Sequence, residues 1–240
     1  MPPRTLLKGR QTDMATQHGI PGETTRIRGV MFALWPLFLA FAFFGAFLSA
    51  LVSGTHVVVS LILFIVSAAA VIALWSRGTR RVCSYFIGAR GEERVAAALG
   101  ALPEGWHVFH DFPSGTRMAD HVVVGPAGIF AIETKNWRGR VEISGGTVSV
   151  DGEVPSRNPL HQARTEAVAV GKAFGDSGWN GQVRAVLCFA GNPFTGGEAN
   201  VAGVDIVNIA DLAGWMAALP HVLDGTGVDR LVHIACTCNT

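Results

Sequence analysis

The chain of 240 residues lacks the motifs that carry several common enzyme chemistries. It contains no phosphate-binding glycine-rich loop, no G-x-S-x-G motif and no G-x-G-x-x-G motif, so nucleotide hydrolysis, acyl transfer and dinucleotide binding have no support. Its four cysteines include one close pair, Cys236-Thr-Cys238, with no second pair to complete a tetrahedral zinc site. We therefore interpret the cysteines as reduced thiols of a cytoplasmic domain.

Charged residues are absent from two long apolar stretches near the N-terminus. Val30 to Val52 spans 23 residues and Val57 to Trp75 spans 19, each long enough, at about 1.5 Å per residue, to cross a hydrocarbon core of about 30 Å. The short neutral segment 53–56 between them predicts a tight transmembrane hairpin. Basic residues flank both outer ends, which places both ends in the cytoplasm; they are Arg26, Arg28, Arg77, Arg80 and Arg81.

Three alternatives for these stretches are disfavoured. A cleaved signal peptide would have a shorter apolar core and no second span behind it. A buried helical hairpin of a soluble protein would need other apolar residues to cover its surface, and the rest of the chain does not supply enough of them. A channel or transporter is disfavoured because neither stretch carries a charged residue.

The remaining sequence predicts one further domain. We expect a disordered cytoplasmic tail over residues 1–28, the hairpin over 29–75, a basic linker over 76–87 and an α/β domain over 88–240. Strands are expected at 140–143, 147–150, 183–189, 204–209 and 231–235, and helices at 159–174 and 211–219. The alternation of strands and helices is typical of an α/β sandwich.

The charge of this domain argues against binding nucleic acid by electrostatics alone. Residues 82–240 contain 11 Lys or Arg and 16 Asp or Glu, a balance of −5 with His neutral. A domain that relied on phosphate neutralisation would be basic. Four arginines near the candidate site described next could form a local basic rim, or be ordinary solvated surface residues; they are Arg138, Arg140, Arg157 and Arg164.

The most informative stretch runs from Asp120 to Lys135. Two runs of strand-forming residues flank Gly125-Pro126-Ala127-Gly128, which predicts a β-hairpin. If Val124 pairs with Ile129, Asp120 faces Glu133, and Lys135 shares the face of Glu133 because strand side chains alternate. Like charges directly opposite destabilise a sheet, so the two carboxylates are either solvated at a frayed hairpin end or neutralised by a cation.

The residue types around this hairpin suit metal-assisted chemistry. Asp120, Glu133 and the backbone carbonyl of Thr134 are hard oxygen ligands of the kind that Mg²⁺ prefers. Lys135 can orient or deprotonate an attacking water and offset charge on a phosphate. A surface hairpin with merely solvated charges is the competing interpretation.

Two neighbouring segments favour the site. Glu92 opens an amphipathic helix and could reach a metal through water, although a Glu at a helix start more often serves the helix dipole. Asn158 and Pro159 predict a helix start, which places Gln162 early in that helix as a polar donor. His121 points away from Asp120 and is expected to be structural, whereas Trp137 is expected to pack or to stack on a base.

Taken in order, Glu92, Asp120, Glu133-x-Lys135 and Gln162 resemble the nuclease-related (NERD) domain of the PD-(D/E)xK nuclease superfamily. The matching pieces are G-x-x-G-E-x-x-V from Gly88, D-H-V-V-V-G-P-x-G-I-F from Asp120, E-T-K-N-W-x-G from Glu133 and N-P-L-x-Q from Asn158. The resemblance implies a mixed sheet flanked by helices, with Asp120 and Glu133 as metal ligands. It also implies Lys135 as the catalytic lysine, Glu92 as an auxiliary acid and Gln162 as a polar accessory.

The sequence therefore predicts a membrane-anchored nuclease dependent on Mg²⁺ or Mn²⁺, and the resemblance implies a bacterial source. Its expected partners are cytoplasmic nucleic acid, with DNA favoured over RNA, and the lipid bilayer of the inner membrane, which it would cross twice with both termini cytoplasmic. The alternative is a binding or signalling module that keeps the nuclease fold without turnover; the intact metal and lysine positions favour the enzyme, and the acidic domain favours the alternative.

Overall fold

A computed structural model describes residues 14–54, 56–115, 117–195 and 199–238, which form two compact units. One unit comprises residues 22–90, and the other comprises the residues before it together with 91–240. A single helix, α2, runs through the boundary at residue 90. The segment 76–87, predicted as a basic linker, is thus part of this continuous helix. It contains no proline and only one glycine, so nothing in its sequence interrupts the helix.

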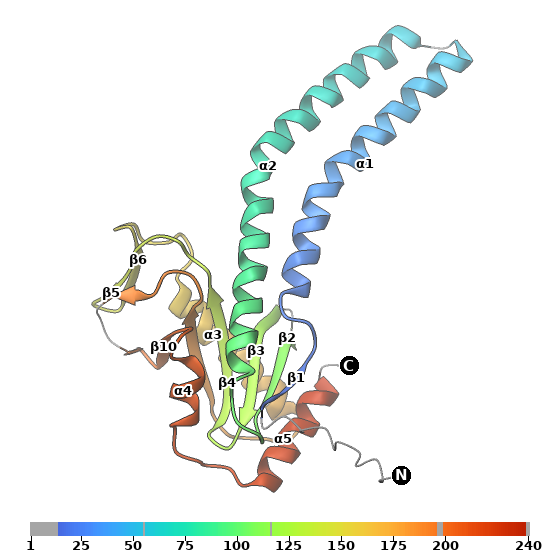
Figure 1. The fold of residues 1–240 in the computed structure, drawn as a ribbon. Helices are drawn as coiled ribbons and strands as arrows, with labels where there is room; N and C mark the ends of the chain where they lie inside the picture. Colours follow the sequence, from blue (N-terminus) through green and yellow to red (C-terminus); the bar gives the residue numbers. More distant parts are fainter. Residues whose placement is uncertain (1–13, 55, 116, 196–198, 239–240) are drawn as a thin grey trace, which may run out of the picture. The chain divides into compact units, whose positions relative to one another are not determined.

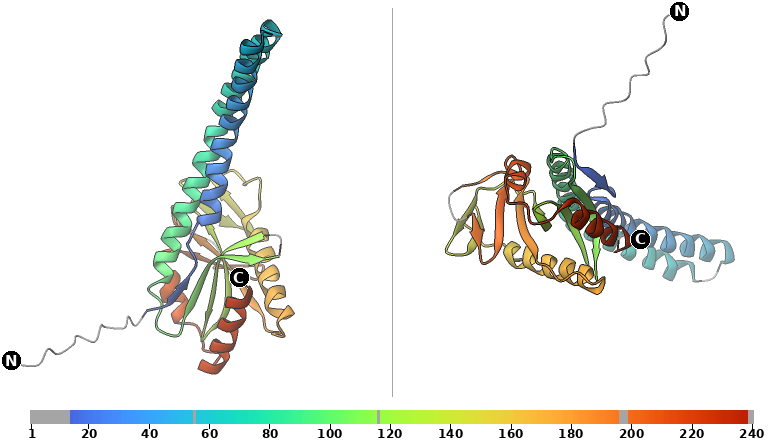
Figure 2. Two further views of the ribbon diagram at one scale, coloured as in Figure 1. Left: turned by 90° about the vertical axis from the view of Figure 1, so that its right-hand side faces the viewer. Right: turned by 90° about the horizontal axis from the view of Figure 1, so that it is seen from below.

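The first unit is a helical hairpin, and Figure 2 shows its two helices running side by side. Helix α1 spans Glu23–Ser53 and α2 spans Val57–Leu99, with Gly54 as the left-handed C-cap of α1. Aromatic rings pack across the hairpin, with the Phe47 and Phe64 centroids 5.5 Å apart. Both helices are long and apolar enough to cross a membrane by length and composition, with best-window mean hydropathies of 2.1 and 3.0.

The second unit contains a seven-stranded mixed sheet with the order β1-β2-β3-β4-β7-β10-β9 (Figure 1). The β1–β2, β4–β7 and β7–β10 pairs are parallel, and the others are antiparallel. The strands are β1 Thr16–His18, β2 His107–Ser114, β3 Arg117–Gly125, β4 Gly128–Lys135, β7 Val183–Phe189, β9 Asn200–Val201 and β10 Val204–Asn208. A small second sheet, of order β6-β5-β8, consists of β5 Val141–Ser144, β6 Thr147–Val150 and β8 Phe194–Thr195.

Helices cover both faces of the large sheet, as the expected fold class requires. Helices α3 (Pro159–Asp176) and α5 (Gly225–Cys238) pack on the face that carries Val122, Ala131 and Leu187. The C-terminal turns of α2 and the short α4 (Leu212–Ala217) pack on the opposite face. Each face has its own apolar core, because side chains alternate along every strand.

Two predictions about the chain ends are wrong. Residues 231–235, expected as a last strand, belong to helix α5, whose buried Val228, Leu231 and Ala235 recur at helical spacing. The tail expected to be disordered over residues 1–28 contains strand β1, and helix α1 begins at Glu23. Strand β1 is fixed by its parallel partner β2 rather than by any apolar pattern of its own. Residues 1–13 of that tail lie outside the described residues.

Candidate functional site

The β3–β4 hairpin has the predicted register. Gly125 pairs with Gly128, Val124 with Ile129 and His121 with Ile132, so the next step places Asp120 opposite Glu133. Regular pairing stops at that step, and the carboxylate of Asp120 instead accepts the backbone N–H of Thr134 at 2.8 Å. The hairpin therefore opens at the position where the sequence places two facing carboxylates.

Lys135 connects this strand to helix α3. Its ammonium forms an ion pair with Glu133 Oε1 and donates a hydrogen bond to Gln162 Oε1 at 3.0 Å. Gln162 is held there because Asn158 caps α3 as expected, with its side chain accepting the N–H of Leu160 at 2.9 Å. The structure thus joins two residues that the sequence separates by 27 positions.

The backbone carbonyl of Thr134 faces the same opening. The carbonyl of Lys135 accepts the N–H of Ala190 beyond the end of β7, so at Lys135 the backbone groups point toward β7. Backbone groups alternate along a strand, and those of Thr134 therefore point toward β3, where its N–H meets Asp120. A carbonyl at this position is an additional oxygen donor beside the two carboxylates.

Helix α2 contributes Glu92 from the opposite side of the sheet. Its side chain is buried, and its negative charge is among the causes that raise the pKa of Asp120. The order of those causes is burial first, then the charge of Glu133, then that of Glu92. Together they raise the pKa of Asp120 well above its usual range, against the opposing effects of the Thr134 N–H and Lys135.

Glu166 is a fourth acid of the site that the sequence reasoning did not identify. It lies one helical turn after Gln162, on the same face of α3, and is only 4% exposed. Burial, a hydrogen bond with Glu133 and the charges of Glu133 and Asp120 raise the pKa of Glu166 to about 11. At neutral pH it is therefore a neutral acid that donates its proton to the Glu133 carboxylate. The i, i+4 spacing from Gln162 is the one pattern that could have indicated it.

The donor set suits a hard divalent cation. Glu133 Oε2 and Glu166 Oε2 are buried and have no hydrogen-bond partner among the described residues. Buried oxygens of this kind are normally satisfied, and a cation would satisfy them while offsetting the repulsion that raises the pKa of Asp120. As they stand, no three Asp, Glu, His or Cys side chains in the described part of the chain are arranged to hold a metal ion.

The four arginines of the expected rim differ in their surroundings. Arg164 is two residues from Gln162, about 200° around the helix, and lines a separate cavity with Gly171, Arg184 and other residues. Arg140 is exposed and pairs with Glu142 at 3.0 Å. Arg138 and Arg157 are exposed, and nothing in their surroundings assigns them a role.

The two aromatic positions considered with the site have packing roles in the structure. The ring nitrogens of His121 and His110 lie 2.8 Å apart, on the face of the sheet away from Lys135. Burial and the neighbouring His110 lower the pKa of His121, so it is neutral at physiological pH. Trp137 packs against Phe189, with centroids 5.8 Å apart, at the edge of the core.

The part of the chain that contains this site matches a known family. Residues 87–190 match the family model of the nuclease-related domain, NERD. The chain is therefore similar to the nuclease-related family over this region. The matched region begins before Glu92 and contains every acid of the site together with Lys135 and Gln162. Neither the curated proteins nor the solved structures include a match to the chain.

Proposed function

We propose that this protein is a membrane-anchored nuclease that hydrolyses phosphodiester bonds of cytoplasmic nucleic acid with Mg²⁺ or Mn²⁺. The observation that carries the proposal is the convergence of Asp120, Glu133, Lys135 and Gln162 at the open end of one hairpin, inside a nuclease-related domain. Several buried acids beside one lysine, with carboxylate oxygens that have no hydrogen-bond partner among the described residues, are typical of a functional site.

Each residue has a role that follows from its position. Asp120, Glu133 and the Thr134 carbonyl are the groups that would hold the ion, which supplies Lewis-acid polarisation of the phosphate and a more acidic water. The ammonium of Lys135, fixed by Glu133 and Gln162, would attract the substrate phosphate and stabilise charge that develops on it. Glu166 would hold Glu133 in place through a hydrogen bond from its neutral carboxyl group.

The test of this activity is cleavage of single- and double-stranded DNA and RNA by the purified full-length chain with Mg²⁺ or Mn²⁺. Lys135→Ala should lower the rate on the order of 10²-fold or more while substrate binding persists, since such a group acts mainly where charge develops. Glu133→Gln should abolish cleavage. Lys172→Ala is the matched control, because Lys172 is an exposed lysine on α3, and it should retain full activity.

The outcomes separate the enzyme from its alternative. Equal cleavage by all variants would mean a contaminant or another site. Binding without cleavage by the wild type on every substrate would favour a nuclease fold that acts as a binding module, the function to which the domain balance of −5 points.

The anchoring part of the proposal has support within the domain unit. Strand β1 precedes the hairpin and β2 follows it, yet Thr16 pairs with His107 and His18 with Phe109 in one sheet. Two segments paired in this way lie on the same side of any membrane that the hairpin crosses, and the flanking arginines favour the cytoplasm as that side.

Thiol labelling tests this topology. Cys83 and Cys236 are exposed, whereas Cys188 is buried. A membrane-impermeant maleimide should label none of them in intact cells, and should label Cys83 and Cys236 after lysis. Labelling of Cys236 before lysis would place the nuclease domain outside the cytoplasm and contradict the proposal.

A further inference from the structure

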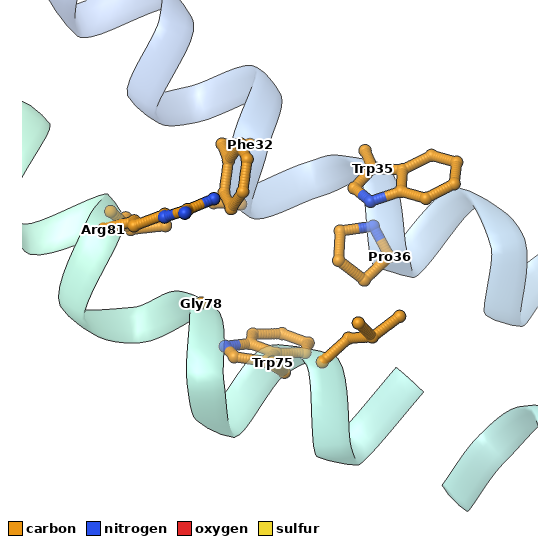
Figure 3. A pocket seen from close by; sticks show the side chains of 9 residues that line it. Phe32, Trp35, Pro36, Trp75, Gly78 and Arg81 are labelled. Carbon is orange, nitrogen blue, oxygen red and sulfur yellow. The ribbon is translucent and has the colours of Figure 1, made fainter. Parts of the chain in front are cut away.

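The helical hairpin has a notch between α1 and α2, lined by Phe32, Trp35 and Pro36 on one helix and by Trp75, Gly78 and Arg81 on the other (Figure 3). Its volume is about 300 Å³, at the lower end of the range for ligand pockets. Trp75, Gly78 and Arg81 are spaced along the stripe of α2 that faces α1. All of these residues belong to the unit of residues 22–90.

The notch exists because small residues meet there. A Cβ added at Gly78 would have only one atom within 4 Å, a ring carbon of Phe32 at 3.7 Å, so the space beside Gly78 is open. Pro36 on the facing helix presents only its compact ring. The two helices pack more closely at Gly29, where an added Cβ would lie 3.0 Å from the Cβ of Tyr85.

The lining combines apolar rings with one cation. The guanidinium carbon of Arg81 lies 6.0 Å from the centre of the Phe32 ring. No acidic side chain of a described residue forms an ion pair with Arg81. Trp35 and Trp75 are about half exposed, as is typical of residues at the boundary between hydrocarbon and headgroups. Arg81 follows Trp75 by six residues, about 9 Å along the helix, which is enough to pass from the hydrocarbon edge through a headgroup layer of about 5–8 Å.

The net positive charge of the hairpin favours a negatively charged ligand. Residues 22–90 contain no lysine and no acidic residue other than Glu23, and their arginines all lie outside the apolar stretches, at the ends away from the turn. They are Arg26, Arg28, Arg77, Arg80, Arg81 and Arg90. A basic cluster of this kind at the cytoplasmic surface attracts anionic lipids.

We propose that the notch binds one anionic phospholipid, with its phosphate at Arg81 and an acyl chain in the groove between Pro36 and Trp75. This inference depends on the membrane insertion proposed above, and it adds a specific lipid site to that anchor. The positive charge of Arg81 favours an anionic lipid over a zwitterionic one. The apolar rings favour a lipid with an acyl chain over free phosphate.

The test uses native mass spectrometry of the delipidated full-length chain, titrated with phosphatidylglycerol or phosphatidylcholine of identical acyl chains. The wild type should bind one phosphatidylglycerol in preference to phosphatidylcholine. Arg81→Gln should reduce that preference about fivefold or more relative to Arg28→Gln, which removes an equal charge outside the notch. Gly78→Leu should fill the groove and lower the preference without changing charge, whereas Gly45→Leu, at a position with no atoms nearby, should not.

Two results would overturn the lipid site. If Arg81→Gln and Arg28→Gln lost the preference for phosphatidylglycerol equally, and the two leucine variants behaved alike, the preference would come from general attraction to the basic surface and not from the notch. A wild-type chain that appears only as a dimer without lipid would assign the notch to a second copy. Alkaline extraction of membranes separates these outcomes from failure of the anchor, because a chain released by carbonate is not inserted at all.

Discussion

Glu166→Gln should stabilise the metal-free protein at neutral pH, although it removes a buried acid from the centre of the site. The pKa of Glu166 is raised from 4.5 to about 11, because the side chain is 4% exposed and faces Glu133 and Asp120. A carboxyl group with a raised folded-state pKa contributes stability that is fully present below pH 4.5. That stability is lost as the pH rises, since the unfolded chain releases the proton and the folded chain keeps it.

The expected size follows from the two pKa values. At pH 7 the carboxyl group in the unfolded chain is 2.5 pH units above its pKa of 4.5 and is therefore ionised. At about 1.36 kcal/mol per unit, this ionisation lowers the free energy of unfolding by about 3 kcal/mol. Glutamine is neutral at every pH and can still donate a hydrogen bond to Glu133. The gain should therefore be about 3 kcal/mol at pH 7 and below about 1 kcal/mol at pH 5, or roughly 6–12 °C in Tm at pH 7.

The measurement is thermal unfolding of the full-length chain in detergent and EDTA, followed by tryptophan fluorescence at pH 5 and pH 7. Glu104→Gln is the matched control because Glu104 is exposed, and it should leave Tm unchanged at both pH values. A gain for Glu166→Gln that is absent at pH 7, or equal at both pH values, would refute the assignment of Glu166 as a buried neutral acid.

Three further predictions concern the same domain. Asp120→Asn should leave Tm in EDTA equal to or higher than that of the wild type, because it removes charge repulsion at a carboxyl group whose pKa is raised. The same variant should lose the rise in Tm that Mg²⁺ or Mn²⁺ produces in the wild type. Burial lowers the pKa of His110 to about 4, so the contribution of His110 to stability should fall by about 3 kcal/mol between pH 6.5 and pH 4. Urea denaturation should therefore show the difference in unfolding free energy between wild type and His110→Gln changing by about that amount over this range. A Cβ at Gly191 would overlap the carbonyl oxygen of Trp137. Gly191→Ala should therefore lower the urea midpoint by the equivalent of about 2 kcal/mol or more, whereas Gly175→Ala, with open space around it, should not.

The parts of the site that the sequence predicted are those set by local rules. The four-residue turn after Val124 fixes the β3–β4 register, and the register then fixes Asp120 against Glu133 and the face of Lys135. The cap at Asn158 likewise fixes where α3 starts, and so where Gln162 points. These features depend on a few adjacent residues, so a sequence pattern can carry them.

The parts that the sequence did not predict depend on distant partners. Strand β1 is three residues long and carries no apolar alternation, and it forms a strand only because β2 offers it an edge. Residues 231–235 are rich in β-branched residues, but the buried face formed with Val228 makes them helical. Glu166 resembles a solvated helix residue in sequence, and only the packing of Ala163, Ala167 and Val170 against the sheet shows that its side chain is directed inward.

The identification of Glu166 changes the charge balance on which the metal proposal rests. Four acids meet one lysine: Glu92, Asp120, Glu133 and Glu166 against Lys135. Glu166 resolves part of the imbalance by keeping its proton, and its hydrogen bond leaves Glu133 as the carboxylate that pairs with Lys135. The repulsion that remains falls on Asp120, whose pKa is raised by both Glu133 and Glu92. Two species can relieve it, a proton on Asp120 or a cation between Asp120 and Glu133. Because they compete for the same site, metal affinity should rise with pH through the pKa of Asp120, and Asp120→Asn should abolish both the affinity and its pH dependence.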